Sequence, residues 1–412
     1  MLEPVKVLPT RRRSLGNAEQ VEPSLIGKSM TFVLKVVSRC NLNCTYCYVY
    51  NKGDATWKDR PVVMREDVLE RALDRIERWC DQTGQQDVRI TFHGGEPLLA
   101  GRVRLDRWCR RIRDRLSGSA NVLFNLQTNG TLIDDAWASL FLENDIEIGV
   151  SIDGPAVVHD AARVDRRGDG SHDRVVQGIN ILQERGVTMG ALAVIQFGAD
   201  SLEIHRHIRS LGVRNMNYLL PDFTHDDVTE IRRAHGLTPC ADYLVPVFDE
   251  WWFHDTMDIN IPLFIAITRL ILGGRSNIDM VGNEPFGFLF IESDGAIEDL
   301  DALRVCRHGM AATGLSVFAN DIAEIGLLSE LHRAAMFDGL PVPTGCHTCP
   351  EATTCSGGYL PHRWSAETFD NPSVWCADLL ALFSHIRGRL EIDVEETDLR
   401  RQALAQMGQA WT

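Results

Sequence analysis

The strongest constraint on the fold is an alternation of short apolar runs and amphipathic stretches between residues 31 and 220. The apolar runs have strand length and end in polar or glycine residues, and the stretches between them have helical periodicity. Such alternation produces a parallel sheet with right-handed crossovers. Because six units are too few to close an eight-stranded barrel, the sequence predicts an open, partial (β/α)6 TIM-like barrel. The expected strands cover 31–37, 88–92, 122–127, 147–152, 187–195 and 215–220, and the expected helices 65–80, 102–117, 134–144, 172–185 and 201–211.

The pattern changes after residue 221. Residues 222–238 have the composition of a loop, helices are expected near 240–254 and 262–272, and 287–297 has the pattern of a β-hairpin with its turn at Asp294-Gly295. The predicted organisation of the 412 residues is an N-terminal tail over 1–28, a barrel over 29–235, a helical linker over 236–284, a smaller cysteine-rich domain over 285–390 and an acidic tail over 391–412.

Three cysteines, Cys40, Cys44 and Cys47, follow the first expected strand in the spacing C-x3-C-x2-C. Three thiolates this close together can hold one corner of a metal site but cannot complete a set of four ligands. Thiolates are the usual ligands of iron–sulfur clusters, and a cubane held by three cysteines keeps one iron open to another ligand. A structural zinc site with a distant fourth ligand is the alternative, although zinc sites more often use paired C-x2-C units.

A second group of cysteines lies near the C-terminus, at Cys346, Cys349, Cys355 and Cys376. Four thiolates can close an iron–sulfur cluster with protein ligands alone, or hold a structural zinc ion. Cys306 lies nearby in sequence without a regular spacing to them. The three remaining cysteines lie in helical patterns and are expected to be plain buried residues: Cys80, Cys109 and Cys240.

The composition argues against several classes of protein. The formal net charge of -15 disfavours a nucleic-acid partner, because no positive field would attract phosphates. The N-terminus has no apolar signal core, and the most apolar helix pattern is interrupted by Arg269, so neither export nor membrane insertion is expected. Eleven cysteines in such a chain indicate metal or redox chemistry rather than disulfides, which predicts a cytoplasmic protein.

Four motifs occur together in the order of one known superfamily. The first cysteine motif with Tyr46, and the runs Gly94-Gly95-Glu96-Pro97, Gln127-Thr128-Asn129-Gly130 and Ser151-Ile152-Asp153-Gly154, resemble the radical S-adenosylmethionine (SAM) superfamily. The later cysteines resemble its SPASM/twitch extension, a small C-terminal Fe–S domain. The resemblance implies a [4Fe–4S] cluster whose open iron chelates SAM, and reductive formation of a 5′-deoxyadenosyl radical that abstracts a substrate hydrogen. It also implies a flavodoxin- or ferredoxin-type electron donor.

The resemblance further assigns seven residues to SAM binding by their places in these motifs. They are Tyr46 and Leu192 at the adenine, Gly94, Gly95 and Glu96 at the methionine amino group, and Ser151 and Arg163 at the ribose and carboxylate. Ordinary packing inside the barrel is the alternative for Ser151 and Leu192.

Different parts of the chain resemble two peptide-modifying branches of the superfamily. Residues 151–167 resemble anaerobic sulfatase-maturing enzymes, whereas residues 218–221, 312–318, 357–363 and 369–373 resemble FxsB-type maturases. The latter install cyclophanes in ribosomally made precursor peptides by joining an aromatic carbon to a β-carbon two residues on. A cyclophane-forming maturase is therefore the leading hypothesis. Another radical oxidation or β-carbon modification of a peptide side chain, and a non-catalytic metal-stabilised binding protein, are the alternatives.

The chain departs from the sulfatase-maturing enzymes at the expected ligand positions of a second auxiliary cluster. The four later cysteines are expected to hold one auxiliary [4Fe–4S] cluster, because Leu300 and Tyr359 stand at ligand positions of a second. Asp301 falls where those enzymes place a proton-accepting Asp. A base there would take the proton that an aromatic ring loses after crosslinking. Capping of a helix or turn beginning near Ala302 is the alternative role for Asp301.

Overall fold

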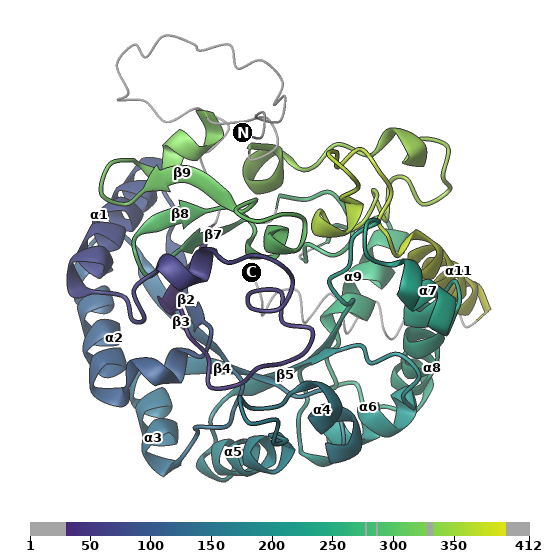
Figure 1. Ribbon diagram of the computed structural model, residues 1–412, viewed down its shortest axis with the longest axis horizontal. Coiled ribbons are helices and arrows are strands. Elements are labelled where there is room, and N and C mark those ends of the chain that lie inside the picture. The colour runs from purple at the N-terminus through teal and green to yellow at the C-terminus, as the bar shows by residue number, and fades with distance from the viewer. Residues whose placement is uncertain (1–29, 277, 286, 328–332, 393–412) are drawn as a thin grey trace.

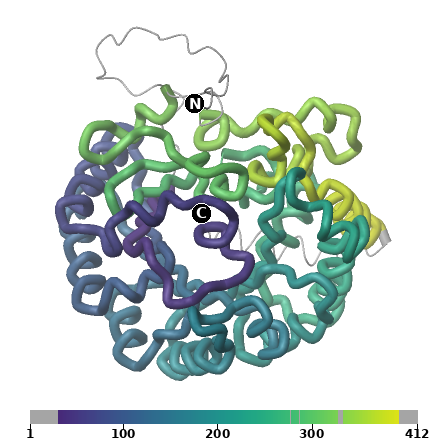
Figure 2. The backbone as a smooth tube through the Cα atoms, in the orientation of Figure 1, coloured from purple at the N-terminus to yellow at the C-terminus, as the bar shows by residue number. Residues whose placement is uncertain are grey.

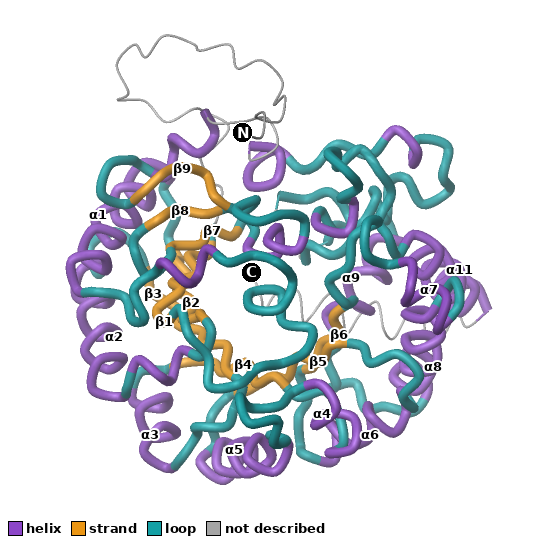
Figure 3. The backbone as a smooth tube through the Cα atoms, in the orientation of Figure 1, coloured by secondary structure: helices purple, strands orange, loops and turns teal. Residues whose placement is uncertain are grey.

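The strands of the computed structural model form one curved sheet, which is the inner wall of an open barrel, and helices cover its outer face (Figures 1 and 3). The structure describes residues 30–392 apart from 277, 286 and 328–332, so the two predicted tails lie largely outside it. The strand order among these residues is β6-β5-β4-β3-β2-β1-β7-β8-β9. The strands are β1 (Thr31–Val37), β2 (Asp87–Gly94), β3 (Asn121–Thr128), β4 (Ile146–Ser151), β5 (Met189–Val194), β6 (Met216–Leu219), β7 (Phe288–Ile291), β8 (Ala296–Glu298) and β9 (Ala312–Ser316).

The predicted series of six strand–helix units is confirmed. Strands β1 to β6 pair in parallel with their neighbours in sequence, and the expected bounds of the six strands and five helices agree with the observed ones within three residues. The helices are α1 (Glu66–Thr83), α2 (Arg102–Leu116), α3 (Asp135–Glu143), α4 (Ala156–Ala162), α5 (His172–Arg185), α6 (Ser201–Ser210), α7 (Thr229–His235), α8 (Pro239–Phe253), α9 (Pro262–Ile271) and α11 (Cys376–Ile392).

Alternate residues of each barrel strand face opposite ways. Phe32 and Leu34 of β1 and Phe92 of β2 belong to the apolar core that also contains the buried faces of α1 and α2. Lys35 and His93 are register partners on the other face of the same two strands. Polar side chains such as Lys35 and His93 therefore face the barrel interior, while the main apolar core lies between the sheet and the helices.

The predicted hairpin forms, but it does not stand apart from the barrel. β7 pairs in parallel with β1, and β8 and β9 extend the same sheet in antiparallel fashion. β1 would otherwise be an exposed edge with unpaired backbone groups, and β7 satisfies them. Strands from both sides of the predicted domain boundary at 285 belong to one sheet, and the boundary itself stays a prediction.

Three helices were not expected from the sequence: α4 inside the connection after β4, α7 inside the supposed loop 222–238, and α11 beginning at Cys376. Each is short or lacks a strong apolar stripe, so periodicity alone does not reveal it. In the part of the chain that the structure describes, no helix is long and apolar enough to cross a bilayer.

Candidate active site

The loop of Cys40, Cys44 and Cys47 follows β1 and crosses the open end of the barrel (Figure 2). Backbone hydrogen bonds attach the loop to the end of α4. The Asn43 amide donates to the Val164 carbonyl at 2.7 Å and the Thr45 amide donates to the Ala162 carbonyl at 2.9 Å. These contacts hold the three cysteines at the carboxyl ends of the parallel strands, where active sites of α/β sheets gather.

The three thiols are free and partly buried. Burial raises the pKa of Cys40 to about 12 and that of Cys47 to about 11, because thiolates are poorly solvated there. Two donors face the Cys40 sulfur, the Leu42 amide at 3.4 Å and the Asn129 side-chain amide at 3.7 Å. A buried set of three thiolates needs a cation nearby. The donor set fits an iron–sulfur cluster with one position left open.

The pair Gly94-Gly95 allows the end of β2 to touch the cysteine loop. The Gly95 amide donates to the Val37 carbonyl at 2.8 Å, and the Glu96 amide donates to the Arg39 carbonyl at 3.0 Å. A Cβ built on Gly95 would lie 2.3 Å from the Arg39 carbonyl oxygen, and one on Gly94 would lie 2.2 Å from that of Val37. This close approach of two backbones therefore depends on glycine.

The Glu96 carboxylate connects two of the motifs. It is fully buried and accepts hydrogen bonds from the Leu98 amide at 3.0 Å, the Asn129 amide at 2.8 Å and the Thr128 hydroxyl at 2.8 Å. Burial raises the pKa of Glu96 to about 7 even though these donors favour the charged form. The carboxylate thereby ties the turn after β2 to the turn after β3. Contact of Glu96 with the SAM amino group stays a prediction.

Tyr46, within the cysteine loop, contacts Arg163, the residue that follows α4. The Tyr46 hydroxyl donates to the Asp153 carboxylate at 2.5 Å and accepts from the Arg163 guanidinium at 2.6 Å. Arg163 is buried, and its Nε has no hydrogen-bond partner among the described residues. A buried guanidinium with an unused N–H fits a carboxylate-bearing ligand such as SAM. Asp153 was not singled out in advance, although it lies within the Ser151-Ile152-Asp153-Gly154 run.

Ser151 and Leu192 are register partners at the ends of β4 and β5. Both are only partly buried, and the residues flanking Leu192, Ala191 and Ala193, belong to the apolar core on the opposite face. The Ser151 hydroxyl accepts a hydrogen bond from the Gln127 amide at 3.0 Å. The two side chains therefore face the barrel interior. There they can contact a bound nucleoside or pack against other interior side chains, so their SAM contacts stay predictions.

Asp301 lies in a buried group of charges beside the cysteine loop. Its Oδ2 accepts from the Lys35 ammonium and from the Tyr48 hydroxyl, the latter at 2.9 Å, and its Oδ1 accepts from Arg304 at 2.6 Å. Although burial opposes ionisation, Lys35 and Arg304 hold the pKa of Asp301 well below its usual range. Asp301 is the first residue of the short helix Asp301–Val305, which has Leu300 at its N-cap and no side-chain capping bond, so the capping alternative is wrong.

His93 belongs to the same interior surface. Burial and the neighbouring Lys35 charge lower the pKa of His93 to about 4, so its imidazole is neutral at physiological pH. Sequence reasoning missed Lys35, Tyr48 and His93. Lys35 carried a visible signal, because a lysine in the middle of the apolar run Thr31–Val37 is unusual in a strand that is buried on both faces.

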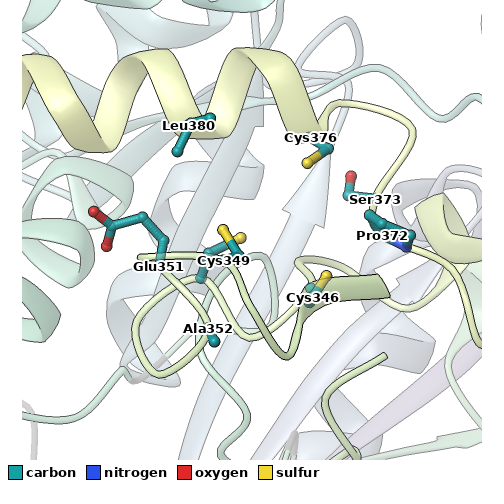
Figure 4. A pocket seen from close by; sticks show the side chains of 10 residues that line it. Cys346, Cys349, Glu351, Ala352, Pro372, Ser373, Cys376 and Leu380 are labelled. Carbon is teal, nitrogen blue, oxygen red and sulfur yellow. The ribbon is translucent and has the colours of Figure 1, made fainter. Parts of the chain in front are cut away.

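The four later cysteines meet at one pocket. All four thiols line this pocket (Figure 4). Cys346, Cys349 and Cys355 lie within ten residues of one another, and Cys376 is the first residue of α11. Burial raises the pKa of Cys355 to about 12. Four convergent thiols fit a cluster or zinc ion with only protein ligands. Cys306 does not line this pocket, and its thiol instead faces the Pro361 carbonyl at 3.7 Å. The predicted buried positions of Cys80, Cys109 and Cys240 are confirmed.

An open barrel with a three-cysteine loop at its mouth, and a closed four-cysteine pocket beside it, defines the class of enzymes that combine SAM with iron–sulfur clusters. The radical SAM superfamily model matches residues 34–199. The serine-type anaerobic sulfatase-maturating enzyme of Klebsiella pneumoniae is 31% identical over 346 residues, which cover 78% of this chain and 79% of that protein. This chain therefore belongs to the radical SAM superfamily and, within it, to the family that includes the anaerobic sulfatase-maturating enzymes.

Two solved structures have the same fold. One is anSMEcpe with bound AdoMet and Kp18Cys peptide, with a TM-score of 0.74 and 22% identity, covering 90% of this chain and 99% of that one. The other is Streptococcus suis SuiB bound to precursor peptide SuiA, with a TM-score of 0.52 and 14% identity, covering 84% of this chain and 76% of that one. The protein is an enzyme, and its cofactors are SAM and [4Fe–4S] clusters.

Proposed function

We propose that this enzyme modifies a ribosomally made precursor peptide by forming a cyclophane crosslink between an aromatic carbon and a β-carbon. Cys40, Cys44 and Cys47 would hold the cluster that binds SAM, and Glu96, Ser151 and Arg163 would orient it. When bound, these cofactors supply a radical that removes a β-hydrogen from the peptide. The likeness to structures with bound peptides supports a peptide substrate.

The observation that carries the proposal is the Asp301 group at the barrel mouth. After a β-carbon radical adds to an aromatic ring, the ring must lose one electron and one proton to recover aromaticity. Asp301 is ionised, and three donors hold it in one orientation. A carboxylate of low pKa is a weak base, but an oxidised ring that still carries its extra hydrogen is a strong acid, so a weak base is sufficient.

The auxiliary site offers an acceptor for the electron that the ring must lose. Cys346, Cys349, Cys355 and Cys376 can hold one closed cluster, which would accept the electron without binding substrate through iron. Leu300 and Tyr359, at the ligand positions of a second cluster, pack with Cys306 in a separate small apolar group. Since that group is made of side chains such as Leu303 and Leu360, it favours one auxiliary cluster rather than two.

The residues that distinguish the FxsB-type pattern build the auxiliary pocket. The Ser373 amide donates to the Gly357 carbonyl at 3.0 Å, and the Val374 amide donates to the His362 carbonyl at 2.7 Å. The runs 357–363 and 369–373 thus pack against each other between Cys355 and Cys376. Their resemblance to the FxsB-type runs is the reason for preferring a crosslink over a simple oxidation.

The test is anaerobic incubation of the reconstituted enzyme with SAM, a flavodoxin- or ferredoxin-type reductant and a synthetic peptide from a short, aromatic-rich reading frame beside the gene. A crosslink removes two hydrogens from the peptide and suppresses tandem-mass fragments between the joined residues. Loss of two hydrogens with full fragmentation would contradict the crosslink and favour oxidation of one side chain.

Oxidation of a serine or cysteine side chain is the second candidate, because of the 31% identity to the Klebsiella pneumoniae sulfatase-maturating enzyme. A control peptide carrying a sulfatase-type Ser or Cys site separates the two functions. Aldehyde formation on that control, without crosslinking of the first peptide, would establish the second candidate. Zinc in place of iron, with no cleavage of SAM, would instead indicate the non-catalytic metal-stabilised binding protein.

A further inference from the structure

Arg363 is a buried cation beside the auxiliary pocket. It is 2% exposed, and its guanidinium donates to three backbone carbonyls: to Gly358 from Nε at 2.9 Å, to Pro341 from Nη1 at 3.0 Å and to Ser356 from Nη2 at 2.8 Å. Within the described residues it makes no salt bridge with a carboxylate. Carbonyl dipoles satisfy its N–H groups but leave its net charge without a counter-charge.

Two of the proposed cluster ligands would act on Arg363 as thiolates. Cys355 and Cys346 are the acidic side chains whose charges favour the protonated guanidinium, whereas burial opposes it. A buried charge without a counter-ion is strongly unfavourable. A closed cluster with four thiolate ligands carries net negative charge and would supply the missing counter-ion.

The backbone around Cys355 is shaped to hold this arginine. Ser356, Gly357 and Gly358 follow Cys355 with φ values of 54°, 90° and 72°, three consecutive residues in the left-handed region. This conformation is unusual for a non-glycine residue such as Ser356 and turns two of the accepting carbonyls toward the guanidinium. A Cβ on Gly357 would approach the Arg363 Cζ to 3.2 Å.

We infer that Arg363 is the counter-cation of the auxiliary cluster and sets its reduction potential, which makes that cluster a better electron acceptor. The inference rests on the proposed closed cluster of Cys346, Cys349, Cys355 and Cys376. Reduction adds a negative charge to the cluster, and a nearby buried cation stabilises the reduced form more than the oxidised form. Net charge and hydrogen bonding are among the factors that set cluster potentials.

The experiment isolates the auxiliary cluster in the full chain that carries Cys40→Ala, Cys44→Ala and Cys47→Ala. Iron and sulfide are counted, and the midpoint potential is measured by redox titration followed by electron paramagnetic resonance. The variants are Arg363→Lys, which keeps the charge, and Arg363→Gln and Arg363→Met, which remove it. Arg389→Gln is the matched control, because Arg389 lies on α11, as Cys376 does, but pairs with Asp249 at 2.7 Å.

The expected result is that Arg363→Lys and Arg389→Gln keep the iron and the potential of the parent. The two neutral variants either load iron with a lower potential or fail to load it. A tenfold change in the one-electron equilibrium corresponds to about 59 mV. Neutral variants with the parent's iron content and potential would overturn the inference. Loss of iron in all three Arg363 variants would also overturn it, because the arginine would then act only by holding the backbone turn after Cys355 in place.

These outcomes are distinct from a failure of the proposed function. A parent without iron would refute the auxiliary cluster itself and would overturn the inference with it. Failure to crosslink a peptide, with the expected potentials, would refute the cyclophane and leave the role of Arg363 intact.

Discussion

Replacing Asp301 with Asn tests both the buried charge group and the proposed proton acceptor. The variant removes the carboxylate that Lys35 and Arg304 share. Arg304 keeps ion pairs with Asp54, Glu292 and Glu298. Lys35, at 3% exposure, has no other ion pair among the described residues. Removal of one partner of a buried pair costs about 3–5 kcal/mol, because the other charge is left uncompensated.

The double variant Lys35→Met/Asp301→Asn separates this electrostatic loss from a loss of packing. It removes both members of the pair and leaves no isolated ammonium, so it should be more stable than Asp301→Asn alone. The free energy of unfolding from urea titration, measured for both single variants and the double variant, gives the coupling energy, which we expect to be about 1–3 kcal/mol. Two single-variant losses that simply add would refute the reasoning that Lys35 depends on Asp301.

The double variant also supplies a folded background for the activity assay. If Asp301 accepts the ring proton, both Asp301→Asn variants should cleave SAM to 5′-deoxyadenosine but yield no crosslinked peptide. Tyr48→Phe removes one donor to Asp301 and keeps the carboxylate, so it should still crosslink. An Asp301→Asn enzyme that forms crosslinked product at the wild-type rate would end the assignment of Asp301 as the base.

Three further predictions concern the cofactor sites. The wild type should bind about eight irons and the Cys40→Ala/Cys44→Ala/Cys47→Ala variant about four. Only the wild type should form 5′-deoxyadenosine. A wild type with about twelve irons would mean two auxiliary clusters. Gly95→Ala should abolish SAM binding measured by calorimetry, because the added Cβ would lie 2.3 Å from the Arg39 carbonyl oxygen. Gly118→Ala is the control and should bind SAM normally, because its added Cβ would have no atom within 4 Å. Burial raises the pKa of Glu96 from 4.5 to about 7, so the folded protein holds this proton over a range in which the unfolded chain has lost it. The free energy of unfolding should therefore fall as pH rises from about 4.5 to 7, less steeply in Glu96→Gln, and equal slopes would contradict the assignment.

The barrel and both cysteine sites could be predicted because their signals are local in the sequence. Strand and helix periods are set by neighbouring residues, and the bounds of β1 to β6 followed from them. The spacing of Cys40, Cys44 and Cys47 places three thiols on one loop whatever surrounds it. The convergence of Cys346, Cys349, Cys355 and Cys376 was also expected, since four thiols in one region suit one metal site.

The charge groups around these sites were decided by the tertiary structure alone. Asp301 meets Lys35 across 266 positions in sequence because β7 joins β1 and brings the hairpin to the barrel mouth. Nothing in the local pattern of either segment announces that pairing. Arg363 likewise becomes a buried cation without a carboxylate only when the turn after Cys355 folds over it. Sequence determined which groups are present, and packing decided which charges lie together, because electrostatic partners depend on distance in space rather than along the chain.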